Sequence, residues 1–218
     1  MKVLLIGHCN AIFMVPLAQA LRQADPDVEL STVGLTRQGK PPSQADQACF
    51  AQNYDLLNRQ NLQQPSKWQS LWNYWKDKGT KTVLSQLFDW KVFRQAVASH
   101  TRAMVLKAYY QPLLVQQEVV MVHYLSPSHL EIVEHMPPNV KLVLCFWGSD
   151  LMQASEPATW QSLHQALHRA DAIVVQHPGM RFLCCVKYGW DLLHRIRLAF
   201  FPLNDDILRQ IKYTTKEE

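Results

Sequence analysis

The sequence predicts an α/β fold in which a doubly wound parallel sheet is flanked by helices. Short continuous apolar runs, typical of strands buried on both faces, alternate with segments whose apolar residues have helical spacing. Such alternation implies parallel strands joined by crossover helices. The length of 218 residues suits one large domain of this kind. The predicted strands are residues 3–6, 28–35, 119–122, 141–146, 172–175 and 196–200.

The first 35 residues read as a β-α-β unit. The run Val3 to Ile6 is ended by Gly7, a helix is predicted over 12–24, and Asp25-Pro26 stops it before the second strand. The right-handed chirality of such a unit puts the loop after Gly7 at the carboxyl edge of the sheet.

A helical insertion is predicted at about 40–115, within a domain that spans 1–205. Residues 36–66 are rich in Gln, Pro, Asn and Ser, which indicates a surface segment with one short helix near 45–58. Residues 67–111 are predicted to be mostly helical, with a break at Gly79 and a long helix from about 89 to 110. Apolar residues share one face of the first helix at positions i, i+3, i+4 and i+7, namely Trp68, Leu71, Trp72 and Trp75.

The β-α alternation returns after residue 118. Helices are predicted over 126–135, 159–169 and 178–187, and a short helix after the last strand. Ser126 is a candidate N-cap, and Pro127 suits the first helical turn.

Composition narrows the function classes. The net charge of +4 suits an anionic partner such as a nucleotide, a phospholipid surface or a lipid-linked phosphate, although an ordinary slightly basic surface explains it equally well. The five cysteines form no C-x-x-C pair, and no His and Cys residues have ligand spacing, so buried thiols in a reducing cytoplasm are expected and a metal site is not. The N-terminal apolar run is too short for a signal peptide, so we expect a cytoplasmic protein that is soluble or peripheral at the inner face of the membrane.

Three common motifs are absent from the sequence. The loop after the first strand lacks G-x-G-x-x-G, which disfavours a dinucleotide-dependent oxidoreductase. No Walker A sequence and no G-x-S-x-G elbow occur, which argues against a P-loop NTPase and an α/β-hydrolase.

Polar residues follow four of the predicted strands, at the edge where parallel sheets bind ligands. Each also has a structural interpretation: His8 can satisfy a tight turn, His123 can be a half-buried core histidine, and Asp150 and His177 can cap the segments that follow them. Their convergence on one edge raises the weight of a functional interpretation. The candidate site residues are Gly7, His8, Asn10, His123, Tyr124, Gly148, Ser149, Asp150 and His177.

Three segments resemble the N-terminal, Rossmann-like domain of GT-B glycosyltransferases, especially glycosyltransferase family 4. They are 2–7 with the following helix, the strand and turn 144–150 that ends in Trp-Gly-Ser-Asp, and 168–180, which is similar to the family's R-A-D-A-I-x-V-x-S-x-x-M stretch. Residues 195–198 and 201–205 are similar to the family's last N-domain strand and interdomain segment. The chain departs from the family at three places. Trp147 stands where many members have His, and Gln176-His177 stands where Ser or Thr is usual. The first loop lacks the glycines that are usual in the family.

The resemblance implies one half of a two-domain hexosyltransferase of polysaccharide biosynthesis. A second domain would bind a UDP- or GDP-linked sugar as the donor substrate and would supply paired glutamates, with no further cofactor. Residues 206–218 would start the interdomain linker and that second domain would be absent here, so this chain alone is expected to be inactive. The expected acceptor is a glycan or a lipid-linked molecule, and no nucleic acid partner is expected.

The resemblance and the residue types suggest roles for the candidate residues. Asp150 would accept a hydrogen bond from the acceptor, and His123 would orient the acceptor hydroxyl or act as a base. Backbone N–H groups after Gly7 would approach the donor phosphates. The alternatives are a non-catalytic Rossmann-like binding module, a partner subunit of a split transferase, and a nucleotide-sugar epimerase.

The tryptophan face of the insertion has two interpretations. Trp68, Trp72 and Trp75 are accompanied by lysines at 67, 76, 78 and 81, a combination that suits peripheral contact with a membrane interface. Alternatively, the same tryptophans pack the helix against the sheet or against a neighbouring helix.

Overall fold

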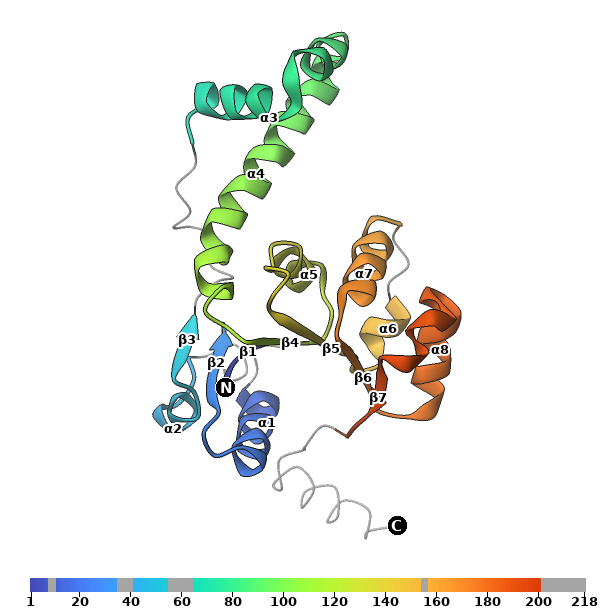
Figure 1. The fold of residues 1–218 in the computed structure, drawn as a ribbon. Helices are drawn as coiled ribbons and strands as arrows, with labels where there is room; N and C mark the ends of the chain where they lie inside the picture. The colour runs from blue at the N-terminus through green and yellow to red at the C-terminus, as the bar shows by residue number, and fades with distance from the viewer. Residues whose placement is uncertain (8–10, 35–40, 55–64, 154–156, 201–218) are drawn as a thin grey trace, which may run out of the picture. The chain divides into compact units, whose positions relative to one another are not determined.

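The structure, a computed structural model, describes residues 1–7, 11–34, 41–54, 65–153 and 157–200 (Figure 1). The predicted site residues His8 and Asn10, and the predicted helix and linker after residue 200, lie outside these residues. The chain divides into two compact units. We call Met1–Leu57 with Leu114–Glu218 the sheet unit, and Asn58–Leu113 the helical unit.

The sheet unit contains one sheet whose seven described strands all pair in parallel, in the order β3-β2-β1-β4-β5-β6-β7. This arrangement confirms the predicted α/β fold with a doubly wound, Rossmann-like parallel sheet. The strands are β1 (Lys2–Ile6), β2 (Glu29–Val33), β3 (Gln52–Tyr54), β4 (Val119–His123), β5 (Lys141–Cys145), β6 (Ala172–Val175) and β7 (Ile196–Leu198).

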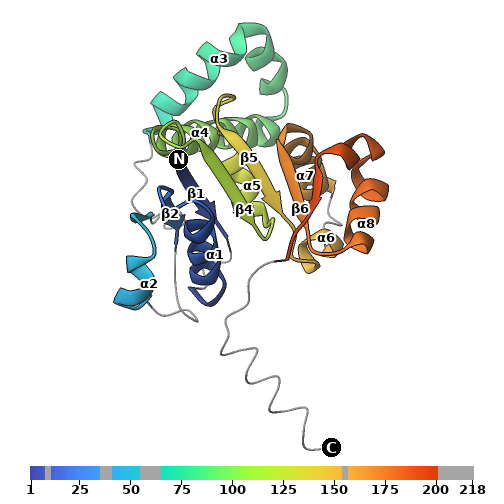
Figure 2. The same cartoon turned by 60° about the horizontal axis from the view of Figure 1, so that its bottom comes forward.

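Helices cover both faces of this sheet. In Figures 1 and 2, α1 lies on one face, and α5 and α7 lie on the other. The helical elements of the unit are α1 (Ala11–Ala24), α2 (Gln44–Ala48), α5 (Pro127–Val133), α6 (Ser149–Gln153), α7 (Pro157–Arg169), α8 (Pro178–Tyr188) and the 3₁₀ helix η2 (Trp190–His194).

Side chains of β1 point alternately to the two faces of the sheet and pack in the core on each face. Val3 and Leu5 pack in one buried cluster with Met14 and Leu17 of α1. Leu4 and Ile6 are also fully buried, and by strand alternation they lie on the opposite face. The continuous apolar run Val3–Ile6 is therefore explained by helices on both faces of the sheet.

The sequence analysis missed β3. It predicted a surface segment with one short helix, whereas the structure has the short helix α2 followed by a strand that pairs with β2. The three residues Gln52–Tyr54 carry polar or half-buried side chains, so no apolar pattern marks them. They form an edge strand because their backbone pairs with Ser31 to Val33 of β2.

The helical unit consists mainly of two long helical segments, α3 (Lys67–Leu87) and α4 (Trp90–Leu114). Ser66 and Gln69 form a capping box at the start of α3. Gly79 has φ 76° and ψ 160°, which confirms the predicted break in the helix. The helix α4 runs through Pro112, although we predicted that it would end before that residue.

The helical unit has its own small core of Tyr74, Val83 and Phe93. The rings of Tyr74 and Phe93 meet edge to face with centroids 6.0 Å apart, and the Tyr74 hydroxyl hydrogen-bonds to Gln86 Oε1. No helix among the described residues is both long enough and apolar enough to cross a bilayer.

Candidate functional site

The candidate site is the carboxyl edge of the sheet, where the strand register brings consecutive loops together. Ile6 pairs with Val122, and His123 pairs with Cys145, which in turn pairs with Val174. The loops that follow β1, β4, β5 and β6 therefore leave the sheet as neighbours. The described candidate residues all belong to these loops or to the strand ends beside them.

Gly7 and His123 lie in close contact at the ends of β1 and β4. A Cβ atom on Gly7 would lie 3.1 Å from the His123 Cβ atom and 3.0 Å from the Met14 sulfur. Any larger residue would have to push one of these neighbours away. The glycine that ends the first strand is therefore required by the approach of His123 and Met14 to the backbone.

The His123 ring is fully buried beneath an aromatic group. Its centroid lies 6.1 Å from that of Trp147, which itself meets Phe13 of α1 edge to face at 5.1 Å. Phe13 and Trp147 are half-buried, so they separate the imidazole from solvent. The sequence analysis weighed a half-buried core histidine, and the structure buries the side chain completely.

Burial lowers the pKa of His123 to about 4, because an imidazolium loses hydration in this apolar setting. The ring is therefore neutral near pH 7, with one donor and one acceptor nitrogen. A base whose conjugate acid has such a low pKa is weak. Of the two roles suggested for His123, these properties favour orientation over proton abstraction.

Asp150 is buried, and both of its carboxylate oxygens accept hydrogen bonds from the backbone. Oδ1 accepts from the N–H groups of Trp147, Gly148 and Leu151 at 3.0, 2.9 and 3.0 Å. Oδ2 accepts from Leu125 N–H at 3.1 Å. The side chain thus joins the loop after β4 to the loop after β5. This geometry favours the structural interpretation of Asp150, and a contact with an acceptor hydroxyl stays a prediction.

Two residues of these loops have positive φ angles, Tyr124 at 62° and Gly148 at 115°. Tyr124 is the one non-glycine residue of the described chain in this region, which costs about 1 kcal/mol or more for an ordinary side chain. Its carbonyl oxygen accepts hydrogen bonds from His129 Nδ1 at 2.6 Å and from Ser126 N–H at 2.9 Å. The turn leaves the Tyr124 side chain half-buried at this edge.

Two predicted site residues, Ser149 and His177, are exposed at the edge. His177 is the N-cap of α8, and its Nδ1 atom accepts a hydrogen bond from Met180 N–H at 3.3 Å. The structural interpretation of His177 therefore holds, while the exposed ring is still accessible to a ligand. No contact joins His177 to His123 or Asp150 among the interactions found in the described residues.

Sequence reasoning missed several residues that build this edge. Phe13 reads as one more apolar residue of a helix, and nothing in its spacing indicates that it packs against Trp147, the ring beside His123. Lys187 donates a hydrogen bond from Nζ to the Leu151 carbonyl oxygen at 2.7 Å, which supports the segment after Asp150. Its position in the last turn of α8 is the ordinary place for a basic residue and gave no signal.

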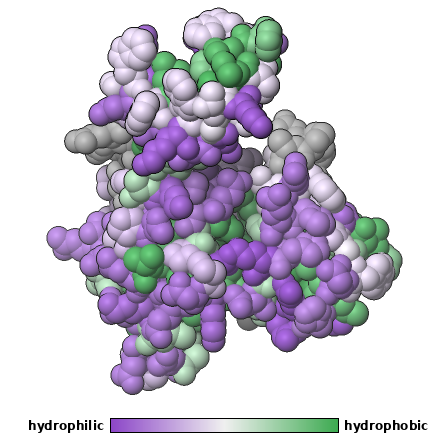
Figure 3. All heavy atoms as spheres, turned by 45° about the horizontal axis from the view of Figure 1, so that its top comes forward, coloured by the Kyte–Doolittle hydropathy of each residue, from purple (hydrophilic) through white to green (hydrophobic). Residues whose placement is uncertain are grey.

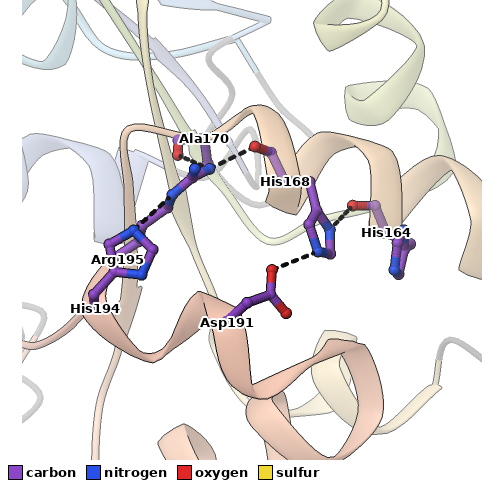
Figure 4. A network of polar contacts seen from close by, with 6 residues as sticks. All are labelled: His164, His168, Ala170, Asp191, His194 and Arg195. Carbon is purple, nitrogen blue, oxygen red and sulfur yellow. Dashed lines mark hydrogen bonds and ion pairs between the residues drawn. The ribbon is translucent and has the colours of Figure 1, made fainter.

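A second group of polar side chains lies at the opposite, amino edge of the sheet (Figure 4). His168 Nε2 lies 3.0 Å from Asp191 Oδ2, and its ring stacks on that of His164 with centroids 4.2 Å apart. Arg195 donates from Nη1 to the carbonyl oxygens of His168 and Ala170. These contacts join the end of α7, which precedes β6, to η2, which precedes β7. We therefore interpret the group as structural. The described residues contain no cluster of His, Cys, Asp and Glu that could hold a metal ion.

In comparisons with known proteins, no family model and no curated protein matches the chain. The fold and the geometry of the carboxyl edge are therefore the basis for a functional proposal. A Rossmann-like fold alone supports many unrelated functions, so the proposal has to be carried by the site.

Proposed function

We propose that the sheet unit is the acceptor-side, N-terminal half of a glycosyltransferase of the GT-B type. The observation that carries the proposal is the contact between Gly7 and His123 at the border of β1 and β4. The strand order reverses at this border, because β2 pairs with one side of β1 and β4 with the other. Open α/β sheets bind their ligands in the crevice outside the strand ends at such a switch point.

The groups around this point suit a polyhydroxylated acceptor. Tyr124, Ser149 and His177 are half-buried or exposed and offer donors and acceptors for sugar hydroxyls. The 14-residue helix α1 begins just after the first loop, and the amino end of a helix favours the phosphates of a donor bound across the crevice.

In this proposal His123 and Asp150 act mainly by positioning the edge. The neutral, buried His123 side chain packs against Gly7 and Trp147 and carries no charge near pH 7. The Asp150 carboxylate fixes the turns that present Tyr124 and Ser149. A precisely held acceptor hydroxyl lowers the barrier by orientation, and a retaining transfer needs no strong base on this half.

A second candidate is a non-catalytic Rossmann-like module that binds a glycan, either alone or as the partner subunit of a split transferase. The hydrogen bonds of Asp150 favour this second candidate, because the carboxylate that was expected to contact the acceptor already accepts hydrogen bonds from four backbone N–H groups. Such a module would bind the same acceptors through the same edge and would transfer nothing.

The test is a transfer assay on this protein, with the nucleotide-sugar-binding half that the proposal requires supplied in the same polypeptide or as a separate subunit. Labelled UDP- and GDP-sugars are supplied with glycan and lipid-phosphate acceptors. His177→Ser removes the imidazole while keeping an N-cap, and His194→Ala removes an exposed histidine from the opposite edge as the matched control. We expect turnover to fall several-fold for His177→Ser alone. Acceptor binding without transfer would support the second candidate. Equal turnover in both variants would contradict the proposal that the acceptor binds at the carboxyl edge.

A further inference from the structure

The helical unit carries the positive charge of this protein. Its described segment, residues 65–113, contains eight of the 22 Lys and Arg residues but only two of the 18 Asp and Glu residues. The segment therefore has a net charge of +6, and the rest of the chain has a net charge of −2. An attraction for anionic surfaces is thus concentrated on the helical unit.

The same unit exposes large aromatic side chains. Four of the seven tryptophans lie on it, and Trp68, Trp72, Trp75 and Trp90 are 81%, 66%, 49% and 61% exposed. Within the helical unit, Trp68, Trp72 and Trp75 are therefore largely exposed and do not pack α3 against its neighbouring helix. The buried residues of α3 are instead Ser70, Tyr74 and Val83. Trp68, Trp72 and Trp75 lie outside the small core of the unit, whereas the Trp90 ring lies beside Phe93 with centroids 5.6 Å apart.

Exposed aliphatic side chains and a phenylalanine accompany the tryptophans. Leu84, Val92 and Phe88 are 55%, 47% and 94% exposed, around the junction between α3 and α4. In Figure 3, green and near-white side chains gather between purple ones at the top of the view, where these helices lie. A surface that mixes apolar, tryptophan and lysine side chains is typical of proteins that bind the bilayer interface.

A cavity of about 600 Å³ lies within the helical unit. Its walls include two cationic side chains, Lys67 and Arg94, together with the apolar side chains of Leu71, Trp90, Phe93 and Val97. This combination matches an amphipathic anion: guanidinium and ammonium groups pair with a phosphate, and the apolar walls cover a hydrocarbon chain.

We infer that the helical unit is a docking surface for bilayers that contain anionic phospholipids, and that its cavity accepts one such lipid. The phosphate would lie against Lys67 and Arg94, and part of an acyl chain would lie against Trp90 and Phe93. The exposed tryptophans would sit at the headgroup level, and lysines such as Lys78 would contact neighbouring headgroups. This inference is independent of the proposed function, since it uses only residues of the helical unit.

The apolar residues decide between a bilayer and a nucleic acid. Single-stranded nucleic acid also binds surfaces that combine basic and aromatic residues, because bases stack on the rings. The aliphatic side chains of Leu84 and Val92 offer bases no stacking partner, whereas they gain from insertion among acyl chains. Charge together with exposed aliphatic surface therefore favours the membrane.

The first test is co-sedimentation of the full chain with vesicles of phosphatidylcholine, with or without phosphatidylglycerol. We expect binding only when phosphatidylglycerol is present, and weaker binding at high salt, because ionic screening acts over about 10 Å at 0.1 M salt. Trp68→Ser with Trp72→Ser should lower the bound fraction at least several-fold. Trp190→Ser, which removes a tryptophan that is 58% exposed on the sheet unit, is the matched control.

The charge is tested with matched lysines. Lys78→Gln should weaken binding to the anionic vesicles, whereas Lys141→Gln, an exposed lysine of the sheet unit, should leave it unchanged. Far-UV circular dichroism of each variant checks that α3 and α4 are intact. Equal binding to neutral vesicles, no binding to either vesicle, or a preference for an oligonucleotide over the anionic vesicles would each overturn the inference.

The cavity is tested with a monomeric short-chain phosphatidylglycerol, followed by tryptophan fluorescence. We expect a saturable change that inorganic phosphate does not produce and that Arg94→Gln weakens several-fold. Ala98→Leu, which adds a bulky side chain to the cavity wall and no new fluorophore, should also weaken the change while leaving vesicle binding through the exposed tryptophans. A response to inorganic phosphate alone, or one that both variants leave intact, would contradict a lipid site in the cavity.

Discussion

The Asp150 carboxylate accepts a hydrogen bond from the backbone N–H of Leu125, 25 residues earlier in the chain, at 3.1 Å. Its other oxygen holds the turn that follows β5. One buried side chain therefore joins two neighbouring strand ends at the edge where the ligand is proposed to bind. A carboxylate suits this task because it offers acceptors only, and four backbone N–H groups converge on it.

Asp150→Asn tests this junction directly. The amide keeps one acceptor oxygen for the turn but turns an N–H donor toward the N–H of Leu125, so a buried donor loses its partner. We expect the free energy of unfolding of the sheet unit to fall by about 1–3 kcal/mol. Urea denaturation followed by circular dichroism measures it, with separate fits if the two units unfold separately.

The matched control is Asp171→Asn. Asp171 accepts one backbone hydrogen bond, from Leu142 N–H at 2.8 Å, but its side chain is exposed at the opposite edge. The amide of Asn keeps one oxygen that can still accept this single bond, and water solvates its N–H group, so the loss of stability should be smaller. An equal loss in both variants would contradict the special role given to the buried carboxylate.

His123 makes stability depend on pH. Its folded pKa, near 4, is below the ordinary value of 6.5, so the unfolded chain binds the extra proton between these values. The contribution of His123 is present above pH 6.5 and is lost as the pH falls toward 4. From the two pKa values, we expect a loss of about 2 kcal/mol between pH 7.5 and pH 5.

The measurement compares urea unfolding at the two pH values for the wild type and for His123→Gln, which cannot titrate. The variant should be less stable at pH 7.5 but should lose less stability on acidification. Identical pH dependence in both proteins would show that the imidazole titrates normally and is not buried as the structure has it.

The strands with apolar side chains were predictable because burial on both faces leaves a continuous apolar run, as in Val3 to Ile6. The edge strand β3 was not, because its pairing with β2 depends on the backbone and its side chains carry no pattern. Local sequence therefore predicts elements whose side chains are buried, and misses those held by backbone pairing alone.

The sequence predicted at which edge of the sheet the candidate residues lie, but not the contacts that they make there. Parallel strands put His123 and Asp150 at one edge, and that much follows from the alternation of strands and helices. The partners of Asp150 could not be predicted, because they depend on a turn in which Tyr124 has a φ of 62°. Likewise, the aromatic cover of His123 could not be predicted, because Trp147, which lies over the imidazole, packs against Phe13, a residue 134 positions earlier in the sequence.

Gly7→Ala tests the close approach of β1 and β4. The added methyl group would meet the Met14 sulfur at 3.0 Å and the His123 Cβ atom at 3.1 Å, so a loss of about 1–3 kcal/mol is expected. Met14→Ala in the same chain opens space for the methyl group. The double variant should therefore lose less stability than the sum of the two single variants, as a double-mutant cycle measures. Strict additivity would mean that the methyl group does not meet Met14.

Burial of the thiols predicts which cysteines react in the folded protein. Cys145 and Cys184 are fully buried, and burial raises the pKa of both thiols, that of Cys184 to about 12, so little thiolate is present at pH 8. Cys49 is only partly buried. Brief treatment of the native protein with iodoacetamide, followed by peptide mass spectrometry, should therefore modify Cys49 and spare the other two until urea is added. Rapid alkylation of Cys145 without denaturant would contradict its place in the centre of the sheet.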